Sequence, residues 1–139
     1  MLVGLPLCGL VACSSEKDTM HHEMAMEPAI SVADQPVAGD SVTIASATVP
    51  EGGFVVIHEV IDGKPQAPQS IGHTPIKAGT TSDVVVKLDK DVPPGSTLIA
   101  MLHNDTGTIG VYEFGPGSTD QDKPTTVDGK PVVKPFKVK

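Results

Sequence analysis

Two groups of histidine and methionine residues supply the side chains of this chain that most readily do chemistry. The first group lies near the N-terminus, where seven residues hold three Met and two His: Met20, His21, His22, Met24 and Met26. Thioether and imidazole are soft to borderline ligands that suit copper, with Met favouring the reduced ion. Their spacing fits no closed zinc pattern. The segment predicts either a flexible metal site or a polar tether in which these residues are incidental.

The second group is three histidines farther along the chain, His58, His73 and His103. His58 and His103 each end the apolar part of a predicted central strand, and neighbouring central strands could bring the two rings together. Three imidazoles, with Glu59 or Asp105 to orient a ring, could bind zinc or type 2 copper. The simpler interpretation is that each ring hydrogen-bonds a loop carbonyl or carboxylate and holds that loop in place.

Enzymatic chemistry finds little support in the sequence. There is no Gly-x-Ser-x-Gly motif, and no serine has neighbours that indicate activation. Gly110 and Gly115 lack the strand, glycine-rich turn and helix that cradle a phosphate. Carboxylates such as Glu59 and Glu113 could pair in space, but acidic residues near loops are usually solvated. We therefore expect no catalytic residues and no enzyme activity.

Both cysteines lie near the N-terminus and indicate a different chemistry. An uncharged, apolar stretch runs from Met1 to Ala12, the tetrapeptide Leu10-Val11-Ala12-Cys13 closes it, and polar residues begin at Ser14. Twelve apolar residues are too few to span a bilayer, which needs about 20. The stretch has the form of a secretory signal whose apolar core ends at a small-residue cleavage site.

This tetrapeptide resembles the lipobox of bacterial lipoproteins. The resemblance implies cleavage before Cys13, acylation of its thiol with palmitate, and a mature protein anchored to a membrane outside the cytoplasm, at the periplasmic face or the cell surface. Cys8 would leave with the signal peptide, so the mature domain would have no disulfide, no cysteine nucleophile and no blue-copper centre. Such signals ordinarily begin with Lys or Arg and none precedes Lys17, so translation could start upstream of Met1.

Composition narrows the fold and the partners. The 139 residues include 10 Lys and Arg against 17 Asp and Glu, a net charge of −7. A nucleic acid would be repelled on average, so we expect no nucleic-acid partner. With no Trp, one Tyr and three Phe, the core must be aliphatic. The 14 Gly and 13 Pro are typical of short strands joined by tight turns.

The pattern along the chain predicts three regions. Residues 1–12 form a signal peptide, residues 13–40 a lipidated cysteine with a flexible tether, and residues 41–139 a β-domain. The predicted strands are Ser41–Val49, Phe54–Ile61, Ser70–Ile76, Ser82–Leu88, Thr97–His103, Val111–Phe114 and Pro131–Val138. Two of them, Phe54–Ile61 and Thr97–His103, are apolar on both faces, as central strands are. Asp62-Gly63 is a strong hairpin signal, and the tetrapeptide Asp-Gly-Lys-Pro repeats at Asp128. Seven or eight strands, spaced about ten residues apart, predict a single all-β domain, an antiparallel immunoglobulin-like or cupredoxin-like β-sandwich.

Four segments carry a second resemblance, in the order Phe54–His58, Ile71–Pro75, Leu98–Asp105 and Gly110–Phe114. Together they are similar to an uncharacterised domain found in secreted or lipid-anchored proteins of archaea and bacteria, over about residues 42–138. The resemblance implies an all-β domain at the cell surface. It brings no established activity, but it places the three histidines within the pattern of the domain.

The sequence therefore predicts a membrane-anchored, extracytoplasmic lipoprotein whose non-catalytic β-sandwich is a binding or envelope-structural module without a cofactor. The alternative is an extracytoplasmic copper- or zinc-binding protein that uses the Met/His tether, the domain histidines, or both.

Overall fold

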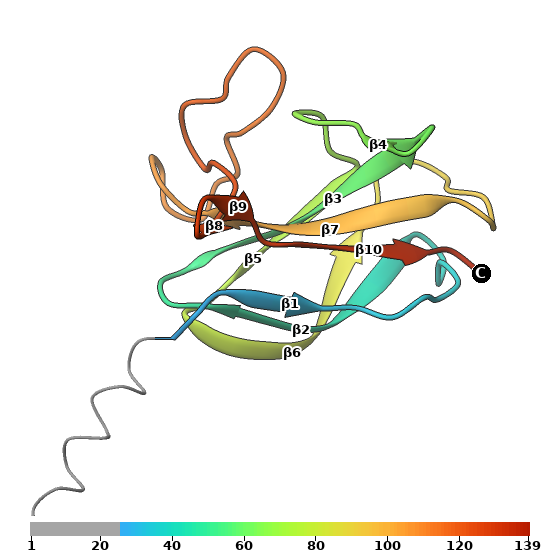
Figure 1. Ribbon diagram of the computed structural model, residues 1–139, viewed down its shortest axis with the longest axis horizontal. Helices are drawn as coiled ribbons and strands as arrows, with labels where there is room; N and C mark the ends of the chain where they lie inside the picture. The colour runs from blue at the N-terminus through green and yellow to red at the C-terminus, as the bar shows by residue number, and fades with distance from the viewer. Residues whose placement is uncertain (1–25) are drawn as a thin grey trace, which may run out of the picture.

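The computed structural model describes residues 26–139, which form strands and no helix (Figure 1). The strands are β1 (Ala29–Ser31), β2 (Ser41–Val49), β3 (Gly53–Ile61), β4 (Lys64–Pro65), β5 (Gly72–Ile76), β6 (Gly79–Lys87), β7 (Thr97–Asn104), β8 (Thr126–Val127), β9 (Lys130–Pro131) and β10 (Val133–Lys137). Every pair of these strands is antiparallel. The predicted all-β, antiparallel sandwich is therefore confirmed. In this part of the chain no helix is long and apolar enough to cross a membrane.

Two sheets face each other. One has three strands in the order β1-β2-β6, and the other has five, in the order β10-β7-β3 with β4 and β5 both paired to the far side of β3. The longest ladder of the second sheet joins β3 to β7, from Gly53 opposite Asn104 to Val60 opposite Thr97. The short β8–β9 ladder stands apart from both sheets.

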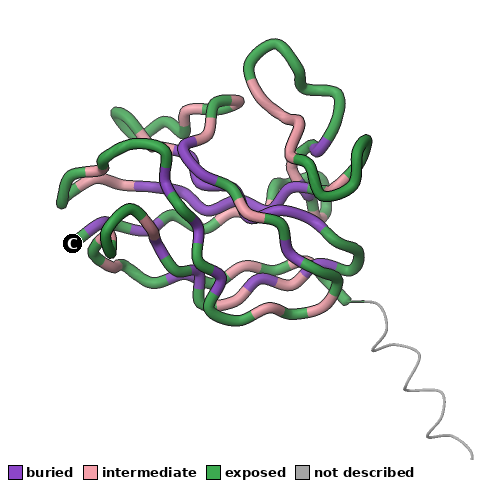
Figure 2. The backbone as a smooth tube through the Cα atoms, turned by 180° about the vertical axis from the view of Figure 1, so that it is seen from behind, coloured by how far each residue is buried: buried purple, intermediate pink, exposed green. Residues whose placement is uncertain are grey.

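An aliphatic core fills the space between the sheets (Figure 2). It contains Val42, Ile44, Ala47, Val49, Val55, Ile57, Val84, Val86, Leu88, Leu98, Ala100, Leu102 and Phe136. Side chains of β6 alternate as predicted, because Val84 and Val86 are buried whereas Val85 is 59% exposed. The period of two along a strand thus places one face in the core and the other in water.

Both Asp-Gly pairs make two-residue hairpins. Asp62 and Gly63 have φ of 53° and 77° between β3 and β4, and Asp128 and Gly129 have φ of 53° and 79° between β8 and β9. Two successive left-handed residues define the type I′ turn, whose twist matches that of the flanking strands. Asp and Gly tolerate this backbone conformation, which is why the hairpin prediction is confirmed at both copies.

The fold begins before the boundary predicted at Ser41. β1 pairs with β2, from Ala29 opposite Thr48, and Val32 is buried in the core. Three residues are too few for a period of two to be visible in the sequence. Residues 29–40 are thus part of the domain, whereas the predicted signal peptide, Cys13 and the tether as far as residue 25 lie outside the described residues.

The first and last segments of the domain are joined side by side. Gln35 bridges in parallel with Val138, with the Gln35 N–H donating to the Lys137 carbonyl at 3.0 Å and the Lys139 N–H donating to the Gln35 carbonyl at 2.9 Å. The Lys137 N–H also donates to Asp34 Oδ1 at 2.9 Å. These bonds connect the chain that follows β1 to the end of β10 and so link the two sheets at one edge.

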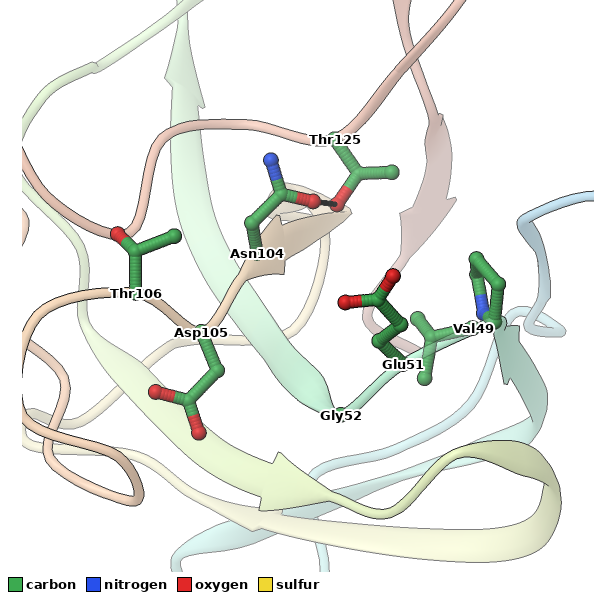
Figure 3. A pocket seen from close by; sticks show the side chains of 8 residues that line it. Val49, Glu51, Gly52, Asn104, Asp105, Thr106 and Thr125 are labelled. Carbon is green, nitrogen blue, oxygen red and sulfur yellow. Dashed lines mark hydrogen bonds between the residues drawn. The ribbon is translucent and has the colours of Figure 1, made fainter.

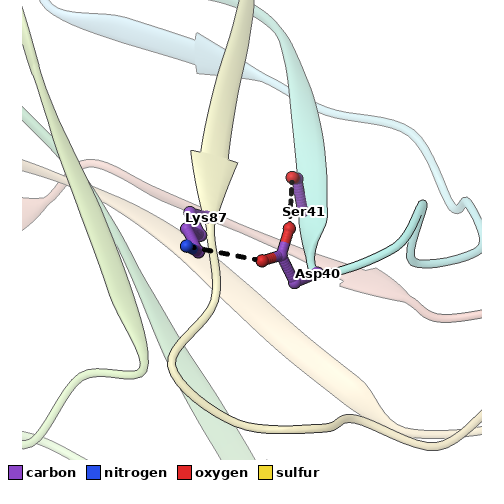
Figure 4. A network of polar contacts seen from close by, with 3 residues as sticks. All are labelled: Asp40, Ser41 and Lys87. Carbon is purple, nitrogen blue, oxygen red and sulfur yellow. Dashed lines mark hydrogen bonds and ion pairs between the residues drawn. The ribbon is translucent and has the colours of Figure 1, made fainter.

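An ion pair lies where β6 ends beside β2 (Figure 4). Lys87 Nζ is 3.6 Å from Asp40 Oδ2, and Ser41 Oγ donates to Asp40 Oδ1 at 3.2 Å. Both charged side chains are exposed, so solvent screening leaves the pair little net energy. The β2–β6 pair is held instead by its backbone ladder and by the buried side chains beneath it.

Two neighbouring valines of β6 test this assignment of faces. We expect Val86→Ala to lower the free energy of unfolding by roughly 1.5–3 kcal/mol, because it removes two buried methyl groups and leaves a cavity. Val85→Ala, on the solvent face, should change it by less than about 0.5 kcal/mol. Chemical denaturation of both variants measures the difference, and equal losses would show that β6 is not oriented as described.

Candidate functional site

The two central strands of the five-stranded sheet, β3 and β7, are buried on both faces. Inner side chains of β3 and β7, such as Val55 and Leu102, belong to the core between the sheets. The alternate side chains point to the outer face, and these too are buried: Phe54, Val56, His58, Ile99, Met101 and His103. Residues 105–125, the long loop after β7, lie over this outer face (Figure 1). The prediction that both strands are apolar on two faces is confirmed.

His58 and His103 approach each other on this outer face, and both are fully buried. The β3–β7 register places His58 opposite Ile99 and His103 opposite Phe54. The two histidines are thus four residues apart along the strands, which corresponds to about 13 Å. Their ring centroids are nevertheless only 6.0 Å apart, with the ring planes inclined by 33°. Both side chains therefore lean toward each other over Met101, which lies midway between them on β7.

Backbone carbonyls of two loops orient the two rings. His58 Nδ1 is 2.5 Å from the Gln69 carbonyl oxygen, and His103 Nδ1 is 2.6 Å from the Asp122 carbonyl oxygen. A carbonyl can only accept a hydrogen bond, so each Nδ1 carries a hydrogen, and in the neutral form of the ring Nε2 keeps a lone pair. Both Nε2 atoms are buried, and neither has a hydrogen-bond partner among the described residues. The rings hold loops in place, as the simpler interpretation expects, but each also leaves one acceptor unused.

The carboxylates that neighbour these histidines in sequence are engaged elsewhere. Glu59 Oε2 lies 3.0 Å from Lys90 Nζ, and Asp105 Oδ2 accepts a hydrogen bond from the Gly110 N–H at 2.9 Å. Neither orients an imidazole.

Asp122 holds the long loop in place. It is fully buried, with φ of 51°. Its Oδ1 accepts from the Thr106 N–H and its Oδ2 from the Glu113 N–H, both at 2.6 Å. Its own N–H donates to Thr106 Oγ1 at 2.8 Å. Charge-assisted bonds of this kind are shorter and stronger than neutral ones, so one side chain ties together both ends and the middle of the loop.

Aromatic rings of the loop cover His103. The Tyr112 and Phe114 ring centroids lie 5.5 Å and 5.0 Å from that of His103, in edge-to-face arrangements. The run Val111–Phe114, predicted as a strand, is irregular loop, which the contacts of the Tyr112 and Phe114 rings with His103 hold in place. Val111 is 50% exposed. Burial, and secondarily the Asp122 carboxylate, raises the pKa of the Tyr112 hydroxyl.

His73 does not join the other two histidines. It is exposed on β5, and its ring lies 4.5 Å from that of Tyr112 and 6.4 Å from that of Phe54, measured between centroids. Tyr112 contacts both His73 and His103. The structure thus brings together two of the three predicted domain histidines, with the third on the far side of the Tyr112 ring.

Burial also sets the charge of His103. It lowers the pKa of His103 from 6.5 to about 4, and His58 adds to this effect, while the hydrogen bond to the Asp122 carbonyl and the Asp122 carboxylate oppose it. His103 is therefore neutral near pH 7 and its Nε2 is free to accept.

A cleft of about 310 Å³ opens between the two loops over the outer face. Its lining residues are His58, Ala67, Pro68, Met101, His103, Phe114, Thr119, Pro124 and Pro131. Most of this lining is apolar, apart from the two imidazoles, the Met101 thioether and the Thr119 hydroxyl. Sequence reasoning missed Met101 and Asp122. Met101 could have been found from its spacing, because it lies two residues from His103 on the same strand and so on the same face.

A second hollow, of about 330 Å³, lies at the end of β7 (Figure 3). Glu51 and Asp105 both line it, and Asn104 Oδ1 accepts from Thr125 Oγ1 at 2.8 Å beside them. Among residues 26–139, no group of three or more His, Cys, Asp or Glu that could hold a metal ion is found. The hollow brings together two carboxylates only.

The predicted metal segment near the N-terminus is mostly outside the described residues. Met20, His21, His22 and Met24 precede residue 26, whereas Met26 is described and 38% exposed. Their role as ligands remains a prediction.

A family model described as a domain of unknown function, DUF7282, matches residues 28–139. The chain belongs to this family. The match begins just before β1 and extends to the last residue, so it covers the whole described fold. It is consistent with the predicted resemblance to an uncharacterised secreted domain, and the Leu10–Cys13 motif lies outside the matched residues.

The chain is also similar to two large surface proteins of Haloarcula hispanica. It is 33% identical to Cell surface glycoprotein 2 over 104 residues, and 33% identical to Cell surface glycoprotein 1 over 103 residues. Each match covers 74% of this chain and 10% of the relative, so the chain spans about a tenth of the length of these curated relatives. No solved structure matches the chain significantly.

Replacing the Asp122 carboxylate should loosen the long loop. Asn tolerates the left-handed backbone but turns an N–H₂ group toward one of the two backbone donors, so we expect Asp122→Asn to cost about 1–3 kcal/mol of unfolding free energy. Amide hydrogen exchange at Thr106 and Glu113 should accelerate with it. Asp120→Asn, at an exposed neighbour, is the matched control and should change neither. Unaltered exchange in Asp122→Asn would contradict the assigned role.

The low pKa of His103 makes stability depend on pH in a defined direction. The unfolded chain takes up this proton near pH 6.5 and the folded domain only near pH 4. Stability contributed by neutral His103 is therefore full above pH 6.5 and is lost as the pH falls toward 4, by roughly 3 kcal/mol.

Denaturant unfolding of the wild type and of His103→Gln between pH 7 and 4 isolates this contribution, because the variant lacks it while His58, Asp122 and Tyr112 remain. A ¹⁵N chemical shift of His103 that titrates near pH 6.5 in the folded domain would contradict the expectation.

Proposed function

We propose that this protein is a lipid-anchored, extracytoplasmic module of the cell envelope whose β-sandwich binds or supports other envelope components without catalysis. The observation that carries the proposal is the family match together with the similarity to two proteins named as cell surface glycoproteins. The similar region has the length of one domain, about a tenth of each glycoprotein. The same kind of domain can therefore serve inside a large surface protein or, in this chain, behind its own anchor.

The lipid anchor is proposed from the sequence before the domain. Cys13 closes the apolar N-terminal stretch, and residues 14–28 separate it from β1. An extended chain spans at most about 3.3–3.6 Å per residue, so these residues reach no more than roughly 50 Å. β1 lies on the three-stranded sheet, while the long loop lies on the opposite side of the molecule (Figure 1). Residues of this loop line the cleft. A membrane anchor at Cys13 leaves the loop-covered face accessible to a partner.

The polar groups of that face support a non-catalytic role. Both oxygens of Asp122 accept hydrogen bonds from loop backbone, and the Nδ1 atoms of His58 and His103 are bonded to loop carbonyls. These groups stabilise a shape. A module of this kind needs a rigid surface for binding, and burial of β3 and β7 on both faces provides rigidity.

The two cysteines offer a matched test of the anchor. In cells that acylate bacterial-type lipoproteins, we expect the wild type to incorporate radiolabelled palmitate and to fractionate with membranes, because the Cys13 thiol is acylated. Cys13→Ser should lose the label entirely. Cys8→Ser should keep it, because this cysteine leaves with the signal peptide. Label retained by Cys13→Ser would refute the anchor, and label lost by Cys8→Ser would place the attachment elsewhere.

A further inference from the structure

Two buried acceptors face one cleft without a donor. The Nε2 atoms of His58 and His103 carry lone pairs, lie in the dry interior and have no partner within residues 26–139. An unsatisfied buried acceptor costs about 1–3 kcal/mol, and two of them side by side indicate that something else occupies the space between. The cleft that both rings line is the place where such an occupant would bind.

The separation of the rings suits one metal ion. An ion that binds imidazole nitrogen at about 2.0 Å from each Nε2 holds the two ring centroids roughly 5–6 Å apart. The observed centroid separation is 6.0 Å. Both Nδ1 atoms donate to backbone carbonyls, which is the second-shell arrangement that keeps the proton on Nδ1 and leaves Nε2 to bind a metal.

Met101 supplies a third donor. It lies midway between the two histidines along the β3–β7 ladder, on the same face, and it lines the same cleft. Its thioether is a soft ligand that selects reduced copper over harder ions. Thr119 and Pro131 also line the cleft and are exposed, so the surface gives access to it.

Charge decides between the candidate ions. Imidazole binds a metal in its neutral form and a thioether is uncharged, so these ligands bring no negative charge. No third His, Cys, Asp or Glu completes a site in the described part of the chain. The cost of burying an ion rises with the square of its charge, so a divalent ion without an anionic ligand is strongly disfavoured here. Structural zinc ordinarily requires four ligands. A monovalent soft ion such as Cu(I) has a smaller burial cost and does not require four ligands.

We propose that the cleft over the outer face of the five-stranded sheet is a Cu(I) site, with His58 Nε2, His103 Nε2 and Met101 Sδ as ligands. The site is independent of the lipid anchor and of the methionines and histidines that precede the domain. It adds a soft-metal function to the proposed envelope module, at the face that lies opposite β1.

Competition titration tests this site in the full chain. Because Cys8, Cys13 and the tether residues Met20, His21, His22, Met24 and Met26 could bind copper themselves, the background carries Ser in place of these cysteines, Leu in place of these methionines and Gln in place of these histidines. We expect this background to take one equivalent of Cu(I) from bicinchoninate under anaerobic, reducing conditions, and to bind Zn(II) much more weakly. Failure to take up Cu(I) with micromolar or tighter affinity overturns the proposal.

Single substitutions in that background identify the ligands. His58→Gln and His103→Gln should weaken Cu(I) binding by at least about 100-fold, and Met101→Leu, which conserves volume, by about tenfold. His73→Gln is the matched control and should bind as the background does. Binding that survives either of the first two substitutions, or that is lost with His73→Gln, rejects the assignment.

A spectroscopic measurement tests the proposed ligands without replacing them. With Ag(I) as a redox-inert probe, histidine ¹⁵N spectra of the background should show shifted Nε2 resonances for His58 and His103 and an unshifted His73. If circular dichroism shows that a histidine variant is unfolded, this measurement and Met101→Leu decide the question alone. Unshifted Nε2 resonances at saturating Ag(I) would overturn the proposal.

Discussion

The buried carboxylate of Asp122 fixes the long loop against the outer face of the five-stranded sheet, and the arrangement of that face depends on it. The two carboxylate oxygens accept hydrogen bonds from the Thr106 and Glu113 N–H groups, and the backbone carbonyl of Asp122 accepts one from the His103 ring. These bonds position Tyr112 and Phe114 over the imidazole. Without them the loop would lose the bonds that connect its two ends to its middle. The loop thus covers the outer face of β3 and β7, as the three-stranded sheet covers their inner face.

The cover that the loop provides explains why two histidines are buried in a protein whose core is otherwise mostly aliphatic. Antiparallel sheets commonly leave one face in water, and a histidine on such a face would titrate normally. Here the cover excludes water from His103, lowers its pKa to about 4 and keeps its ring neutral. The same cover supplies the carbonyls that occupy Nδ1. Dryness and orientation together leave two nitrogen lone pairs exposed to a single cleft, with a thioether between them.

Most strands and turns could be predicted from the sequence because short-range patterns determine them. The alternation in β6 and the two Asp-Gly turns required only the sequence around them, and the two-faced strands β3 and β7 were visible as unbroken apolar runs. β1 was missed because three residues show no period. The strand predicted at Val111–Phe114 does not form, because tertiary contacts override β-propensity there. The site was harder to foresee: nothing in the loop distinguishes Asp122 from Asp120, and the histidines meet only because their side chains lean across about 13 Å of strand.

The parallel bonds between the Gln35 segment and the end of β10 give the domain a mechanical character. Gln35 accepts from Lys139 and donates to Lys137, while Asp34 accepts from Lys137. The two segments run in the same direction, so a pull that draws Met26 and Lys139 apart slides one along the other. Such a pull strains all of these bonds together, in shear, and does not open them one after another. A domain pulled from its two ends would therefore resist extension where its two sheets are joined.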